Sequence, residues 1–296
     1  QHDRRAGADA DIFPPARMVL SPMPGDLDSG LGTLVEAHGE GRGIAAASYV
    51  LYGPDGATRV AGGVIEEVQA CIFVNGVELA TVMCSPIAIK DLALGFLRLE
   101  GFIDALSDVR QIVLSKGGLC ADVWLNRGFS PPARRILTSG CGGGLTFDDL
   151  SAARPRMSST FSVSPGQIIE GMRQTHLAGE LYRLVRGVHT ACLSDGLRLV
   201  YIAQDIGRHN TIDRLCGMAL QAGHDTRDHV LFASGRISSE MLSKASRMAV
   251  PIVVSRTSPT SLSVRLAQAW NITVIGYCRG GQFRVYSGAD RIRPVA

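Results

Sequence analysis

One cysteine of this chain lies in a stretch that glycine makes unsuited to regular structure. In the segment 138–144 four of the seven residues are glycine, and the central residue is Cys141. Glycines let the backbone approach a ligand closely and direct successive N–H groups at an anion. The same dipoles favour a thiolate over a thiol, so the segment predicts a nucleophilic Cys141. The competing interpretation is a flexible linker that contains an incidental cysteine.

Polar residues also follow the strands that the sequence predicts. One such turn carries Asp205, Arg208 and His209, which could receive an anion or position a polar ring, while Asn210 suits a helix cap. The next turn carries Arg236, whose side chain suits a phosphate near a helix N-terminus. Taken singly, each turn is equally compatible with helix capping and ordinary surface charge.

Further features of the last third strengthen the case for an anionic ligand. The segments 258–260 and 277–282 make two more polar turns, and from residue 230 onward nine Arg and Lys residues face two acidic ones. Several polar turns at one sheet edge indicate a sizeable ligand that bears phosphate. Glu240 and Lys244 are four residues apart, a spacing typical of an exposed helical ion pair.

The pattern of the chain predicts the elements that must position these residues. Residues 1–45 lack apolar periodicity and are expected to form a flexible arm. Residues 46–160 predict a small α+β domain that ends in the cysteine loop, with these elements: a hairpin over 68–82 turning at Asn75-Gly76, a helix with Pro86 at its first position, and strands over 109–114 and 121–125.

Residues 161–296 alternate between strand and helix patterns, which indicates an α/β layered domain with a partly parallel sheet. The predicted strands span 188–194, 197–204, 229–234, 251–255, 272–278 and 283–287. The predicted helices begin at Ser164-Pro165 and span 210–222, 238–249 and 259–269, with Ser238 suited to an N-cap.

Composition excludes several function classes. The net charge of +3 is too small to indicate nucleic acid, and no apolar run approaches the ~18 residues of a membrane span. No secretion signal is visible, so a cytoplasmic location is expected. Seven scattered cysteines without a C-x-x-C pair predict reduced thiols, mostly in the core, and no structural metal.

Several ordered segments together resemble the FdhD/NarQ family of formate dehydrogenase accessory sulfurtransferases, over roughly residues 67–286. The segments that carry the resemblance are Val74-Asn75-Gly76, Met83-Cys84-Ser85-Pro86, Leu92-Ala93-Leu94-Gly95-Phe96-Leu97, Glu100-Gly101-Phe102-Ile103, Thr138-Ser139-Gly140-Cys141-Gly142, Gly187-Val188-His189-Thr190-Ala191, Asp205-Ile206-Gly207-Arg208-His209-Asn210, Ser234-Gly235-Arg236-Ile237-Ser238-Ser239-Glu240-Met241 and Ser258-Pro259-Thr260.

The resemblance implies a function and a fold. Cys141 would accept sulfur as a persulfide from a cysteine desulfurase and pass it to the molybdenum or tungsten of a bis(molybdopterin guanine dinucleotide) cofactor that formate dehydrogenase requires. A homodimer and a C-terminal domain similar in fold to cytidine deaminases are also implied. The segment matching the family's cofactor-binding stretch is Tyr277, Cys278, Arg279, Gly280, Gly281 and Gln282, to which we add Asp205, Arg208, His209 and Arg236 as expected nucleotide and phosphate ligands.

Two departures qualify what the resemblance implies. A zinc deaminase needs His-x-Glu and Pro-Cys-x-x-Cys, and neither His189-Thr190-Ala191 nor the segment 234–240 supplies them, so deamination is rejected. Many relatives carry a second cysteine where this chain has Gly144. Cys141 would therefore act alone, and a second hypothesis remains: a non-catalytic chaperone that binds the cofactor for formate dehydrogenase.

Overall fold

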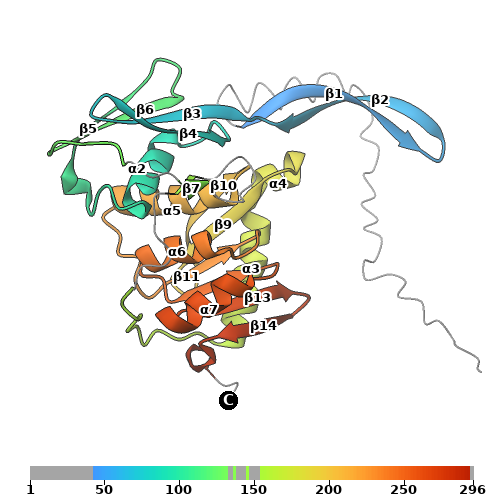
Figure 1. Ribbon diagram of the computed structural model, residues 1–296. Coiled ribbons are helices and arrows are strands. Elements are labelled where there is room, and N and C mark those ends of the chain that lie inside the picture. The colour runs from blue at the N-terminus through green and yellow to red at the C-terminus, as the bar shows by residue number, and fades with distance from the viewer. Residues whose placement is uncertain (1–42, 133–135, 138–144, 147–153, 294–296) are drawn as a thin grey trace, which may run out of the picture.

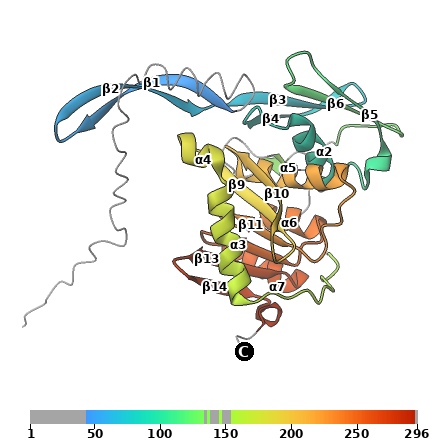
Figure 2. The same cartoon turned by 180° about the vertical axis from the view of Figure 1, so that it is seen from behind.

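The protein is described from a computed structural model. The structure describes residues 43–132, 136–137, 145–146 and 154–293. Two sheets with their helices form the body, and a two-stranded ribbon projects from it (Figures 1 and 2). The predicted α/β class is confirmed, because the larger sheet is mixed and lies between helices.

The N-terminal part is a four-stranded sheet with one helix beneath it. Its strand order is β4-β3-β6-β5. Its elements are β3 (Val68–Val74), β4 (Val77–Cys84), α2 (Ile89–Leu99), a 3-10 turn (Leu106–Asp108), β5 (Val109–Leu114) and β6 (Cys120–Leu125). The predicted hairpin is confirmed, with Asn75 at φ 51° and Gly76 at φ 78°, the left-handed pair that such a turn requires. Alternate residues of β3 (Ala70, Ile72 and Val74) are buried toward α2.

The helix predicted from Pro86 begins later, at Ile89. Residues before it are used in tertiary contacts: the Ser85 N–H donates to Asp205 Oδ2 at 3.0 Å, and the Ser85 and Ile87 carbonyls accept from the Arg214 guanidinium. Ala88 then adopts φ 46° before the helix starts. The local preference of proline for the first helical position is thus overridden by bonds to the other half of the molecule.

The C-terminal part is a six-stranded sheet in the order β10-β9-β11-β12-β13-β14. Strands β10, β11, β12 and β13 run parallel to one another. Strand β9 lies between β10 and β11 and runs antiparallel to both. Helix α3 covers one face, and α5, α6 and α7 cover the other (Figures 1 and 2). The bounds are α3 (Pro165–Ala178), α4 (Glu180–Val185), β9 (His189–Ser194), β10 (Leu199–Asp205), α5 (Arg208–Gln221), β11 (Val230–Ala233), α6 (Ser239–Arg247), β12 (Ile252–Ser255), α7 (Ser261–Trp270), β13 (Thr273–Arg279), β14 (Gln282–Ser287) and a 3-10 turn (Ala289–Arg291).

Side-chain caps fix where three of these helices begin. Ser164 caps α3 and forms a capping box with Gln167, Ser238 accepts from the Met241 N–H at the start of α6, and Thr260 caps α7. The predicted cap at Asn210 is wrong, because α5 begins at Arg208 with Gly207 before it. Asn210 instead donates to Asp205 Oδ1 at 2.8 Å and to the Met83 carbonyl at 2.9 Å.

Helices α2 and α5 join the two parts by packing backbone against backbone. A Cβ built on Gly95 would lie 1.6 Å from the Asp213 carbonyl oxygen, and one on Gly217 would lie 2.0 Å from the Asp91 carbonyl oxygen. Only glycine permits this close approach. The crossing thereby holds the N-terminal sheet over the amino-terminal end of α5, which belongs to the candidate site below.

The ribbon consists of β1 (Ile44–Gly53) and β2 (Gly56–Ile65), paired antiparallel from Ile44↔Ile65 to Gly53↔Gly56. Sequence analysis missed it, because a run of alanine and glycine masks the alternation of apolar residues. Its base rests on α4, where Gly63 faces Val185. The short strands β7 (Ile136–Leu137) and β8 (Leu145–Thr146) pair with each other on either side of the cysteine loop.

Candidate functional site

The polar turns gather at one edge of the larger sheet, as predicted. Because β10, β11, β12 and β13 are parallel, their carboxyl ends share an edge, and the antiparallel β9 begins at the same edge. This edge therefore carries His189, Arg208, Ser234, Arg256 and Arg279. The sheet thereby brings together three arginines, one histidine and one serine from the ends of five strands.

The turn between β13 and β14 forms one wall of a cavity of about 260 Å³. Gly280 (φ 60°) and Gly281 (φ 74°) line it in left-handed conformations, a backbone arrangement that favours anion binding in glycine-rich turns. Arg256 after β12 adds positive charge to the same cavity, and Arg173 from α3 also lines it, with its guanidinium paired to Glu170 at 2.6 and 2.7 Å. The cavity is lined by Ile169, Met172, Arg173, His176, Arg256, Cys278, Arg279, Gly280, Gly281 and Gln282. Five of the six members of the predicted cofactor-binding stretch, Cys278 through Gln282, therefore line one concave surface.

The first two residues of that stretch have structural contacts. Tyr277 lies outside the cavity lining; its N–H donates to the Thr257 carbonyl at 2.9 Å, and its ring lies 4.4 Å from the Arg284 guanidinium and 5.7 Å from that of Arg279. Cys278 is buried, and burial raises the pKa of its thiol to about 11. Tyr277 thus holds Arg279 in place, and the protonated Cys278 thiol offers a ligand little but shape.

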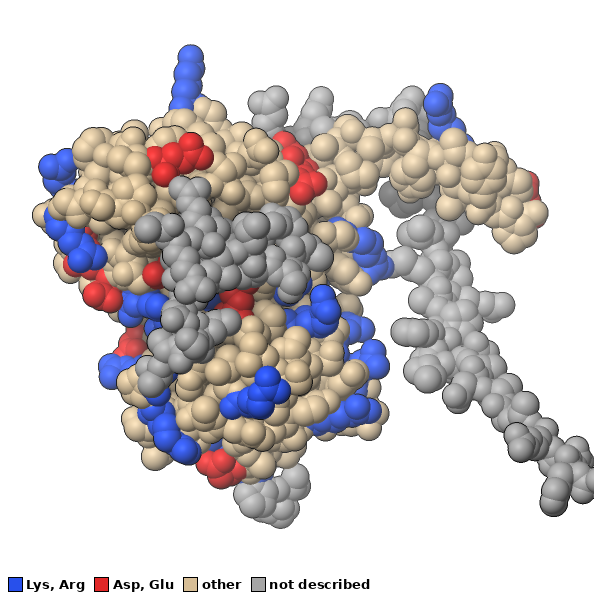
Figure 3. All heavy atoms as spheres, viewed as in Figure 1, with Lys and Arg blue, Asp and Glu red and all other residues tan. Residues whose placement is uncertain are grey.

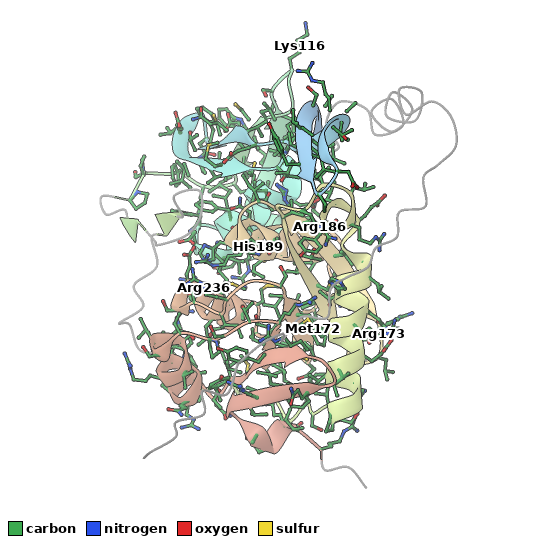
Figure 4. The ribbon with its side chains drawn as sticks, turned by 90° about the vertical axis from the view of Figure 1, so that its right-hand side faces the viewer. Lys116, Met172, Arg173, Arg186, His189 and Arg236 are labelled. Carbon is green, nitrogen blue, oxygen red and sulfur yellow. The ribbon has the colours of Figure 1, made fainter. Side chains whose placement is uncertain are left out.

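A second cavity, also about 260 Å³, adjoins the first and shares Met172, His176 and Arg256 with it. In Figure 4, Met172 lies on the inner side of α3, Arg173 on its outer side, and His189 at the start of β9. The remaining lining residues are Thr175, Tyr182, Val188, His189, Thr190 and Ser234. The two cavities together form one elongated site with Arg256 at their junction.

Neutral histidines line this second cavity. Arg256 Nη1 donates to His176 Nδ1 at 3.0 Å, and burial followed by the charges of Arg256, Arg186 and Arg183 lowers the pKa of His176. Burial and then the charge of Arg208 lower the pKa of His189, whose Nδ1 lies 3.3 Å from Ser234 Oγ. Both rings therefore present one donor or acceptor each at neutral pH and add no charge.

Arg208 is the clearest sign that this edge receives an anion. Its side chain is 6% exposed, yet its Nε has no partner, and no hydrogen bond or ion pair of its guanidinium occurs among the residues the structure describes. Gly235 separates it from His189: a Cβ there would lie 3.1 Å from His189 Nδ1 and 3.3 Å from Arg208 Cδ. A buried charge without a protein partner is costly, and an anionic ligand would compensate it.

His209 faces the interior rather than the cavities. Its Nδ1 lies 3.3 Å from Glu240 Oε2 and its Nε2 3.2 Å from Ser238 Oγ. Burial, then the charges of Lys244 and Arg208, lower the pKa of His209 to about 2. The neutral ring therefore lies against Glu240 through Nδ1 and shares a hydrogen bond with the Ser238 hydroxyl through Nε2. These contacts connect the start of α5, next to Arg208, with the start of α6.

Two expectations for this edge are wrong. Asp205 was expected to hold a ligand, but it is fully buried and its carboxylate accepts from Arg214 Nη2 at 2.6 Å and from the Gly207 N–H at 2.7 Å. The pair Glu240 and Lys244 was expected at the surface, but both are buried, and Lys244 Nζ donates to Asp213 at 2.6 and 2.8 Å. Helical spacing alone does not reveal whether α6 turns a pair outward or inward.

The described residues contain no group of three His, Cys, Asp or Glu side chains able to hold a metal ion.

Arg236, which was expected to bind phosphate, lies apart from the two cavities. It is exposed on the α6 side of the edge, away from α3 (Figure 4). No helix in the described ranges is long and apolar enough to cross a membrane.

Comparison with known proteins agrees with this geometry. Residues 65–293 match the model of the FdhD/NarQ family. The chain belongs to this family. A sulfur carrier protein FdhD of Staphylococcus aureus strain MRSA252 is 39% identical over 235 residues, which cover 77% of this chain and 88% of the relative. The sulfur carrier protein FdhD of strain Newman matches with the same identity and coverage.

A solved structure also matches. The crystal structure of a formate dehydrogenase accessory protein from Desulfotalea psychrophila superposes with a TM-score of 0.71 at 24% identity, covering 84% of this chain and 99% of that one. This likeness shows that the two chains share a fold. The FdhD/NarQ match begins at residue 65, so the ribbon lies almost wholly outside it.

The nucleophile that the sequence predicts for this FdhD/NarQ chain, Cys141, lies outside the described residues, as do Gly140, Gly142, Gly143 and Gly144. Of the other six cysteines, four are buried and Cys71 and Cys120 are half-buried. Burial raises the pKa of Cys84 to about 11 and those of Cys192 and Cys216 to about 12, which leaves these thiols protonated.

Sequence analysis overlooked residues that the fold brings to the site. His176 and Tyr182 come from helices whose side of the sheet no local pattern reveals, and His189 was considered only as part of a resembling segment and of a zinc motif that lacks its glutamate. Arg256 directly follows β12, so its place at a strand end was a usable signal. The excess of basic residues after position 230 pointed to the same surface.

Proposed function

We propose that the protein is a sulfurtransferase. It carries sulfur as a Cys141 persulfide from a cysteine desulfurase to the molybdenum, or tungsten, of a bis(molybdopterin guanine dinucleotide) cofactor required by formate dehydrogenase. The supporting observation is the FdhD/NarQ match over residues 65–293, a range that contains Cys141 and whose relatives are named sulfur carrier proteins.

The reaction divides into two sulfur transfers. The Cys141 thiolate attacks the outer sulfur of the desulfurase persulfide, the S–S bond of that persulfide breaks, and the desulfurase cysteine leaves as a thiolate. The outer sulfur of the new Cys141 persulfide then passes to the metal, which formally supplies two electrons, and Cys141 returns to a thiolate. The glycines around Cys141 supply backbone freedom and N–H donors for these anions.

The elongated site supports the choice of a phosphate-bearing cargo. Arg256 and Arg279 line its first cavity, and Arg208, which has no partner among the described residues, is separated by Gly235 from His189 of the second. Guanidinium groups and exposed backbone N–H groups are the donors that proteins use for phosphates. The neutral His176 and His189 with Tyr182 suit a polar ring of the same ligand.

The test is sulfur loading of Cys141. After incubation with a cysteine desulfurase and cysteine, the wild-type chain should gain the mass of one sulfur atom on the peptide that contains Cys141, and Cys141→Ala should gain none. Cys120→Ala, at a half-buried thiol elsewhere, is the matched control and should load normally. Loading that persists in Cys141→Ala would refute the assignment of the carrier.

A cellular assay separates the transferase from the cofactor-binding chaperone that Gly144 leaves as the alternative. Cells lacking the protein should regain formate dehydrogenase activity with the wild-type chain and not with Cys141→Ala. Full activity with Cys141→Ala would favour the chaperone. The family resemblance further suggests a homodimer.

A further inference from the structure

Two half-buried thiols lie opposite each other on neighbouring strands of the N-terminal sheet. Strands β3 and β6 run parallel, and their register pairs Cys71 with Cys120. Among the cysteines that the structure describes, no other two are registered partners, and the remaining four are buried. The fold therefore brings together the two accessible thiols of the described chain from distant positions in the sequence.

The alternation of burial places both thiols on the same face of the sheet. The neighbours of Cys71 in β3, Ala70 and Ile72, are buried toward α2. Ala121, which follows Cys120 in β6, is buried on the same side. Successive side chains of a strand point to opposite faces, so both thiols point away from α2. In Figure 3, where this sheet lies at the top, the side in view is mostly uncharged, so neither sign of charge keeps a small thiol reagent away.

Backbone hydrogen bonds hold the two cysteines in this position. The Cys71 N–H donates to the Leu119 carbonyl at 3.1 Å. The Cys120 N–H donates to Ser115 Oγ at 3.1 Å, and the Cys120 carbonyl accepts from the Ser115 N–H at 2.8 Å. Neighbouring strands lie about 4.8 Å apart, and disulfides join Cα atoms that are about 4.4–6.8 Å apart. A bond between the two sulfur atoms is therefore within reach of side-chain rotation, without movement of the strands.

The Cys71 thiol interacts with its neighbours on both sides. Thr81, its registered partner in β4, donates from Oγ1 to the Cys71 sulfur at 3.8 Å. Burial, followed by the interaction with the Cys120 thiol, raises the pKa of Cys71, and the Thr81 hydroxyl opposes this rise. The thiolate is the reactive form, so a raised pKa makes Cys71 react faster as the pH rises above neutral.

We propose that Cys71 and Cys120 form a reversible disulfide by exchange with a low-molecular-weight disulfide of the glutathione class. One of the two, as its thiolate, attacks a sulfur of the small disulfide, whose S–S bond breaks and releases one small thiolate. The second protein thiolate attacks the protein sulfur of this mixed disulfide, forms the Cys71–Cys120 bond and releases the other small thiolate. The two cysteines lose two electrons and two protons, and the small disulfide becomes two thiols. Accessible disulfides are readily reduced, so excess thiol reverses the bond.

The bridge would crosslink the centre of the N-terminal sheet. In the order β4-β3-β6-β5, the pairing of β3 with β6 joins the β3–β4 hairpin to the β5–β6 hairpin. A bond between Cys71 and Cys120 closes a loop of about 50 residues, which limits the freedom of the unfolded chain and stabilises the folded one. Oxidation would therefore strengthen the sheet that carries α2.

The test is exchange of the full chain with oxidised glutathione at about pH 8, followed by alkylation of free thiols and peptide mass spectrometry. The wild-type chain should yield the Cys71 and Cys120 peptides linked to each other. Cys71→Ser should instead retain glutathione on Cys120, and Cys120→Ser should retain it on Cys71. Cys141→Ala is the control and should form the bridge like the wild type. The bridged chain should unfold about 5 °C or more higher, and dithiothreitol should restore the original midpoint.

Glutathione on both cysteines of the wild type without a bridge, or no reaction at either, would overturn the proposal. A bridge from either cysteine to Cys141 would do the same. A bridge that lowers the thermal midpoint would also overturn it, because such a bond would form only when the strands separate. The exchange needs no desulfurase, so these failures leave sulfur loading of Cys141 unaffected, and loss of that loading would count against the proposed function alone.

Discussion

Replacing Arg208 by glutamine should change ligand binding and stability in opposite senses. The guanidinium is 6% exposed and has no hydrogen bond or ion pair among the described residues, so removing its charge leaves no protein group without a partner. We therefore expect Arg208→Gln to be as stable as the wild type or more stable, because an uncompensated buried charge disappears. A structural arginine would give the contrary result.

The loss of ligand affinity can be estimated from the bonds that Arg208 is free to make. A hydrogen bond to a charged group contributes about 1.5–3 kcal/mol, which corresponds to about a 10- to 150-fold weaker binding of GDP, taken as the guanine-nucleotide end of the cofactor. At a GDP concentration of 100 times the wild-type Kd, binding stabilises the wild-type chain by about 2.7 kcal/mol. A variant that binds fifty-fold more weakly would gain below about 1 kcal/mol at the same concentration.

The assay is urea unfolding with and without GDP, together with calorimetric titration of GDP. Arg214→Gln is the matched control: Arg214 is equally buried but is bonded to Asp205 and to the Ser85 carbonyl, so its loss should cost about 3–5 kcal/mol without GDP. Arg236→Gln, at an exposed arginine, should leave stability and affinity unchanged. An Arg208→Gln chain that is less stable by about 2 kcal/mol or more, as expected when a buried ion pair is broken, and that binds GDP like the wild type would refute the reasoning.

Three further predictions concern the framework of the site. Gly95→Ala should destabilise by about 1–3 kcal/mol in urea unfolding, because its Cβ would lie 1.6 Å from the Asp213 carbonyl oxygen, while Gly128→Ala, with nothing within 4 Å, should stay within about 0.5 kcal/mol of wild type. Asp205→Ala should cost about 3–5 kcal/mol and, if Asp205 is structural, should leave the GDP affinity of the folded chain near its wild-type value. His209, with a folded pKa of about 2, contributes stability that is fully present above about pH 6.5 and is lost as pH falls, by about 2 kcal/mol at pH 5. Between pH 7 and pH 5 the wild type should lose about 2 kcal/mol more stability than His209→Asn in urea unfolding; an identical loss in both chains would contradict the assignment.

Local features of the sequence determined much of the secondary structure. The left-handed pair Asn75-Gly76 turns β3 into β4, and Ser164, Ser238 and Thr260 end the strand-side loops by capping α3, α6 and α7. Each of these signals depends on bonds within four residues, so no distant contact is needed to read it. The alternation of strands and helices after residue 161 likewise predicted a layered sheet whose carboxyl edge carries Arg208 and Arg279.

Tertiary structure decided which of those charged residues meet solvent or a ligand. Asp205 and Arg208 are three residues apart and both buried, but Asp205 is paired with Arg214 across α5 while Arg208 has no partner in the described residues. The same long-range bonds at Ser85 delay the start of α2 to Ile89. Sequence by itself determined the types of chemistry available, because they depend on residue identity and local bonding. Only the fold determined which charges are compensated, because their partners can lie far along the chain, as Ser85 lies 129 positions from Arg214.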